Sequence, residues 1–154
     1  MGTALELGGE GLQALSAADR AWLAASIESL VPALGVPVER AAVEVVRDAR
    51  MRALHARHMG LDSTTDVLTF AQNAPGQPVD VDVAVCVDEA TRRGAGAPHG
   101  VRGELLLYAL HALLHACGHD DRDAASHARM HAEEDRILEA AGFGRLFEAG
   151  EGAP

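Results

Sequence analysis

The chain has 154 residues, a length that predicts one domain with its own core, and 48% of its residues are apolar against 23% charged. The formal net charge of −10 argues against a protein that coats nucleic acid by bulk attraction, although a local basic patch is compatible with it. No secretory leader and no apolar run of about eighteen residues is present, so we expect neither export nor a membrane span. Cys86 and Cys117 lie in apolar stretches, which predicts free thiols in a reducing, cytoplasmic location.

The N-terminal third predicts two strands and two helices. Residues 4–7 are compatible with a short edge strand. Ser16, with Asp19 three residues later, is typical of a helix N-cap, and the amphipathic helix that follows ends at Gly35. A short strand is then expected over residues 42–46, and a second helix over residues 48–59.

The second helix and the residue before it carry the only dense basic cluster. Its members are Arg47, Arg50, Arg52 and Arg57. Such a cluster is compatible with a solvated face, and equally with a surface that contacts phosphate groups, which guanidinium groups bind through paired hydrogen bonds. The residues alone leave both interpretations open.

The next segment predicts two more strands, one over residues 67–70 and one from Val79 onward. In the second of these, valines alternate with Asp80, Asp82, Ala84, Cys86 and Asp88. The change from acidic to small residues indicates that the second face of this strand becomes buried along its length. A loop is expected over residues 94–100.

Two helices are predicted in the C-terminal part. The first, over residues 102–117, is apolar nearly all round, which indicates burial on most sides. The second, over residues 123–141, turns Met130, Ile137 and Leu138 inward and ends at Gly142. We predict one domain over residues 1–147 and a frayed tail over residues 148–154.

The buried helix contains the strongest functional signal. His111 and His115 are four residues apart, so their β-carbons lie roughly 5–6 Å apart on one helix face, within reach of one metal ion. Gly118 allows the chain to turn in a left-handed conformation and bring back a third ligand. On reach, Asp121 is preferred and His119 is the alternative. Two imidazoles, one carboxylate and an open fourth position are the donor set of catalytic zinc.

The residue after the first histidine bears on the reaction class. Metalloproteases with the H-E-x-x-H motif carry a glutamate there as general base, whereas this chain has Ala112. Alanine cannot move a proton, which argues against peptide hydrolysis by that mechanism. Metal-assisted attack of water on a phosphodiester, with arginines to stabilise the charge, remains open.

Three motifs together resemble the YbeY family of metal-dependent endoribonucleases. The segment HALLHACGHDD (residues 111–121) is similar to the family's H-G-x-L-H-L-x-G-Y-D-H, and TDVLTF (residues 65–70) is similar to T-D-V-L-S-F. The strand VDVAV (residues 81–85) corresponds to G-D-I-V-I, and Met130 and Glu134 fall in the family's C-terminal helix pattern. The matches run in the family's order from about residue 42 to 142.

The resemblance implies an α+β fold, with a small mixed four-stranded sheet packed with about five helices and one Zn²⁺ on the buried helix. It implies a single-strand-specific endoribonuclease that acts in maturation of small-subunit ribosomal RNA and in ribosome quality control. By position, the zinc ligands and, through the metal, the catalytic residues are His111, His115 and Asp121. Arg57 is a candidate phosphate contact.

Three positions depart from the family pattern. Asp121 stands where the family has its third histidine, Ala112 replaces a glycine, and Met59 replaces an arginine that is thought to serve RNA cleavage. Met59 favours an alternative, namely a zinc-stabilised ribosome-associated factor with weak or no nuclease activity. In either case we expect ribosomal RNA, the small ribosomal subunit and ribosome-associated proteins as partners, and no membrane.

Overall fold

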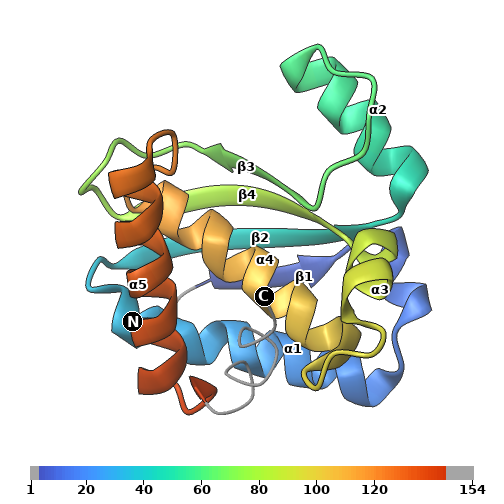
Figure 1. Cartoon of the computed structure of the whole chain (residues 1–154), viewed down its shortest axis with the longest axis horizontal. Coiled ribbons are helices and arrows are strands. Elements are labelled where there is room, and N and C mark those ends of the chain that lie inside the picture. The colour runs from blue at the N-terminus through green and yellow to red at the C-terminus, as the bar shows by residue number, and fades with distance from the viewer. Residues whose placement is uncertain (1–3, 145–154) are drawn as a thin grey trace.

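A computed structural model describes residues 4–144 and has the α+β architecture that the resemblance implied. Its four-stranded mixed sheet has the order β1-β2-β4-β3 (Figure 1). The first three strands in this order run parallel, and β3 pairs antiparallel to β4. The strands are β1 (Ala4–Gly8), β2 (Val38–Val46), β3 (Val67–Ala71) and β4 (Val79–Cys86).

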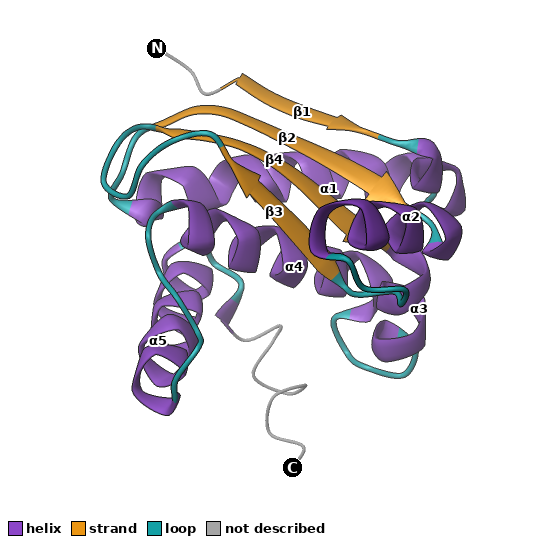
Figure 2. Cartoon of the chain, turned by 90° about the horizontal axis from the view of Figure 1, so that it is seen from above, coloured by secondary structure: helices purple, strands orange, loops and turns teal. Residues whose placement is uncertain are grey.

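Within residues 4–144, five α-helices pack around the sheet, and most of them lie on one of its faces. One face is covered by α1 and α4, with α5 alongside α4, whereas α2 covers only one end of the other face (Figures 1 and 2). Short 3₁₀ turns occupy Glu10–Ala14 and Val31–Leu34. The helices are α1 (Ala17–Leu30), α2 (Asp48–Met59), α3 (Val87–Gly94), α4 (Gly100–Ala116) and α5 (Ala124–Ala140).

The alternation in β4 separates two cores. Val83 and Val85 face α4 in the main core, because successive side chains of a strand point to opposite faces. Ala84 and Cys86 face α2 in a smaller core and are 2% and 0% exposed. The prediction that the second face of this strand becomes buried is therefore confirmed.

Several predicted element boundaries are confirmed. The backbone N–H of Asp19 donates to the Ser16 hydroxyl at 3.1 Å, as expected for the N-cap of α1. The second helix has the predicted bounds, and β1 lies at the edge of the sheet. In α5, the side chain of Asp123 forms the N-cap, and the three apolar residues predicted to face inward are at most 2% exposed.

Two boundaries were predicted wrongly. β2 begins at Val38, and not at residue 42, because it is paired on both sides and its Arg40 binds Asp80 and Asp82 of β4 at 2.8 and 2.9 Å. The valine alternation ends at Cys86, since residue 87 starts the helix α3, which we did not predict. Val87 continues the alternation of the strand, but a valine at this position is equally compatible with the buried first residue of a helix.

Three further predictions concern the ends, the thiols and the membrane. Both cysteines are free, Cys86 buried and Cys117 half-buried. In the part of the chain that the structure describes, none of the helices has the length and hydropathy to cross a bilayer. The predicted boundary at residue 147 and the tail after it lie outside the described residues, so both stay predictions.

Candidate metal centre

The helix α4 carries the two histidines at its C-terminal half. Leu110, Leu113 and Leu114 are at most 1% exposed, so most of this helix is fixed in the main core. His111 and His115 lie on the remaining stripe, where their side chains are 29% and 31% exposed. Burial of the leucines therefore fixes the face on which both imidazoles stand.

A glycine turn at the end of α4 brings the third donor back. Gly118 has φ +103°, and its N–H bonds to the His115 carbonyl while the His119 N–H bonds to the Leu114 carbonyl, both at 3.0 Å. These two bonds form a Schellman motif, which satisfies the last carbonyls of a helix and turns the chain. A side chain at Gly118 would be strained by this φ and would also press on Pro75 at 3.1 Å.

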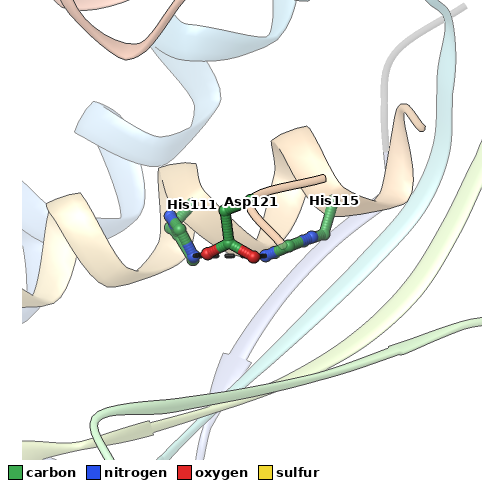
Figure 3. Close-up of side chains that lie close together, drawn as sticks. All are labelled: His111, His115 and Asp121. Atoms are coloured by element: carbon green, nitrogen blue, oxygen red, sulfur yellow. Dashed lines mark hydrogen bonds and ion pairs between the residues drawn. The ribbon is translucent and has the colours of Figure 1, made fainter. Parts of the chain in front are cut away.

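The turn places Asp121 across the two imidazoles (Figure 3). Its carboxylate oxygens lie 3.4 Å from His111 Nε2 and 3.9 Å from His115 Nε2. The two Nε2 atoms are 3.2 Å apart, and all three ligand atoms lie within 4.8 Å of one another. Two nitrogens bound to tetrahedral zinc at about 2.0–2.1 Å are separated by about 3.3 Å. The donor set therefore fits a zinc ion with one position left open.

The second ring nitrogen of each histidine has its own partner. His111 Nδ1 lies 3.1 Å from a carboxylate oxygen of Glu134 on α5, and His115 Nδ1 lies 3.1 Å from the His119 carbonyl. The hydrogen bond to Glu134 raises the pKa of His111, and burial of the ring opposes the rise. Both Nδ1 atoms thus face acceptors, which leaves both Nε2 atoms to face Asp121.

The structure separates the predicted candidates. His111, His115 and Asp121 come together, whereas His119 lines a separate polar cavity of about 230 Å³ between the end of α4 and α5. Arg57 is exposed on α2, whose packing is against the opposite face of the sheet.

The basic cluster is partly neutralised. Arg47 pairs with Asp88 at 3.0 Å, and Arg50 lies 3.6 Å from Glu44. Among residues 4–144, neither Arg52 nor Arg57 has an ion pair. Only part of this surface is therefore available to an anion.

Two carboxylates near the centre received no role from the sequence. Glu134 lies between Met130 and Ile137 on the inward stripe of α5, and a charged residue among buried apolar ones was a signal that could have found it. Asp66, at the start of the TDVLTF motif, pairs with Arg93 at 3.2 Å, and its charge contributes to the raised pKa of His111. Asp66, which directly precedes β3 within this motif, therefore lies near the candidate metal centre.

The mixed α+β fold and the His-His-Asp donor set define a class of protein with a candidate metal centre at the end of a buried helix. The family model described as "Endoribonuclease YbeY" matches residues 13–142. The chain belongs to the YbeY endoribonuclease family.

Known relatives and a solved structure agree with this assignment. The endoribonuclease YbeY of Moorella thermoacetica is 31% identical over 131 residues, which are 77% of this chain and 84% of the relative. That of Anaeromyxobacter is 35% identical over 113 residues, 72% of this chain and 59% of the relative, so the chain spans about three fifths of that protein. A solution structure of a Thermotoga maritima protein has a TM-score of 0.65 over 97% of both chains at 22% identity, which shows the shared fold.

Proposed function

We propose that this protein is a single-strand-specific, metal-dependent endoribonuclease. It acts in maturation of small-subunit ribosomal RNA and in ribosome quality control. The observation that carries the proposal is the convergence of two Nε2 atoms and one carboxylate at zinc-ligand separation, in a chain of the YbeY family. Peptidase chemistry of the H-E-x-x-H type is disfavoured, because Ala112 has no side chain that could move a proton.

In this proposal His111, His115 and Asp121 would hold one Zn²⁺. Zinc bound in this way supplies a Lewis acid and lowers the pKa of water to about 7. The chain's own residues orient the donors: the Schellman turn aims Asp121, and the His119 carbonyl holds the His115 ring.

We assign substrate binding to the exposed arginines of α2. Arg57 lies in the last turn of this helix, is exposed, and has no ion pair within residues 4–144. A guanidinium in this state is free to bind a phosphate of single-stranded RNA through two hydrogen bonds. In this proposal the protein's partners are ribosomal RNA, the small ribosomal subunit and proteins bound to that subunit. The location is the cytoplasm, where Cys86 and Cys117 would stay reduced.

A second candidate function rests on Met59. This side chain is 60% exposed at the end of α2, where the family resemblance places an arginine. Without that cation, the developing charge on the phosphate would have less stabilisation. The alternative is therefore a zinc-stabilised, ribosome-associated binding factor whose cleavage is weak or absent.

The variant His115→Ala tests the proposal. We expect it to lose both bound zinc and cleavage of ribosomal RNA, measured by metal analysis and by gel assay on the same preparation. His127→Ala, an exposed histidine of α5, is the matched control and should retain both.

Two results would contradict the nuclease proposal. Cleavage that persists in metal-free His115→Ala would show that the metal centre is not the active site. Fully loaded wild-type protein that leaves RNA intact but co-sediments with small subunits would establish the binding factor instead.

A further inference from the structure

Glu134 joins the metal centre to the outer face of α5. One of its oxygens lies 3.1 Å from His111 Nδ1, and the other lies 3.5 Å from Nδ1 of His131, one turn earlier on the same helix. The Glu134 side chain is 17% exposed, whereas that of His131 is 54% exposed. A mostly buried carboxylate thus lies between a proposed metal ligand and a surface histidine.

We propose that Glu134 is a positioning residue of the metal centre, which fixes His111 with Nδ1 protonated and with Nε2 directed at the metal. This inference rests on the proposed function only in so far as His111 is taken to be a ligand. It assigns a specific role to a residue that lies 23 positions from His111 in sequence and on another helix.

The argument starts from the donors and acceptors of the two groups. An ionised carboxylate can only accept hydrogen bonds, so the ring nitrogen that faces it must carry the proton. In neutral imidazole the other nitrogen then holds the lone pair, and for His111 this is Nε2, the atom 3.4 Å from Asp121. The contact with Glu134 therefore selects the tautomer that can bind metal at the observed place.

The same contact orients the ring and raises its basicity. A histidine ligand whose second nitrogen donates to a carboxylate is held more firmly, and is a stronger donor, than one that is free to rotate. His115 differs, because its Nδ1 faces the neutral carbonyl of His119. The two imidazoles of this centre consequently differ as metal donors. The donor strength of His111 depends on a side chain, Glu134, which can be substituted.

The packing of α5 against the core holds the backbone of Glu134 in place. His131 lies 3.5 Å from the second oxygen of Glu134 and 3.9 Å from Asp135, on the solvent side of the carboxylate. Met130 and Ile137, at most 1% exposed, fix the helix against the core on either side of Glu134. Because apolar burial already attaches α5, the polar contact is not needed to keep the helix in place.

The test is zinc affinity, measured by competition with a chromophoric chelator, for wild type, Glu134→Gln and Glu134→Ala. Loss of an outer partner of a metal-bound histidine costs about 10–100-fold in affinity, and we expect this loss for Glu134→Ala. Glu134→Gln keeps an acceptor without the charge and should fall between the two. Glu133→Gln is the matched control, because the neighbouring Glu133 binds Arg136 at 2.8 Å and should leave the affinity unchanged.

A second measurement distinguishes a role of Glu134 in positioning the His111 ring from a role in attaching α5 to the rest of the protein. In long-range ¹H–¹⁵N NMR of the zinc-loaded protein, we expect the Nδ1–H of His111 to be protected from exchange in wild type and exposed to it in Glu134→Ala. The melting temperature of the metal-free variants reports whether α5 has loosened.

The outcomes are distinct. A Glu134→Ala variant that folds and binds zinc with wild-type affinity overturns the inference while the proposed function stands. Weakened zinc binding in a chain whose wild type does not cut RNA supports the inference and contradicts the nuclease proposal. Failure of the wild-type chain to bind zinc overturns both.

Discussion

The third ligand is the most specific element of the proposed metal centre, and Asp121→Asn tests it with little change in shape. Asparagine keeps the size of the side chain but replaces an anionic donor with a neutral amide. In the structure the Asp121 carboxylate faces both imidazoles, at 3.4 and 3.9 Å. The substitution should therefore act on metal-linked stability far more than on folding without metal.

The magnitude follows from mass action. With zinc at 100 times the wild-type Kd, binding stabilises the folded state by about 2.7 kcal/mol. For a domain of this size, that corresponds to a rise in Tm of about 5–11 °C. Loss of a direct ligand should weaken binding by at least about 100-fold, the upper end of what loss of an outer partner costs. At the same zinc concentration the variant then gains only about 0.4 kcal/mol, or about 1–2 °C.

The assay is thermal unfolding with and without zinc, so that each protein serves as its own reference. Asp120→Asn is the matched control: its carboxylate binds Arg122 at 2.8 Å, and it should keep the full zinc-dependent rise. If Asp121→Asn shows the same rise as wild type, Asp121 is not a ligand and the reasoning from ligand separation is refuted.

Three further predictions follow from other parts of the molecule. His119→Ala should change zinc affinity by less than about 10-fold in the chelator assay, because only its backbone carbonyl, which alanine retains, holds His115. Met59→Arg should increase RNA cleavage and steepen the salt dependence of RNA binding by about 0.7 in log–log slope, with Met59→Gln as control; an unchanged slope would show that residue 59 does not approach a phosphate. The hydrogen bonds from Arg92 hold the pKa of Asp48 at about 2, below its usual 3.8, so this stabilisation is complete above pH 3.8 and is lost as pH falls toward 2. Asp48→Asn should therefore lower Tm by about 1–4 °C at neutral pH, with a difference from wild type that shrinks between pH 4 and 2; a constant difference would contradict the ion-pair argument.

Much of the fold could be read from local patterns. The Ser16 cap, the bounds of α2, the two faces of β4 and the inward residues of α5 each follow from periodicity or capping within one segment. The errors have a different origin. Residues 38–41 and 87–94 were misread because pairing with a neighbouring strand, or burial against another helix, outweighs a short local pattern.

The same division applies to the metal centre. His111 and His115 follow from sequence because both lie on one rigid helix, whose pitch sets their separation before any tertiary contact forms. Gly118 indicated the turn after this helix, because a glycine that ends a helix in the left-handed conformation depends only on the local backbone.

The position of the candidate third donor and the contact that supports His111 needed the tertiary structure. Reach along the chain favours Asp121 and leaves His119 as the alternative, and in the folded turn Asp121 is the one that lies beside the two imidazoles. The contact of Glu134 with His111 exists only because α5 packs against α4. The sequence by itself determined the candidate metal-binding residues, through helical periodicity and the glycine turn. Packing between distant segments decided which side chain supports His111, because such contacts depend on how buried surfaces fit together and have no fixed spacing along the chain.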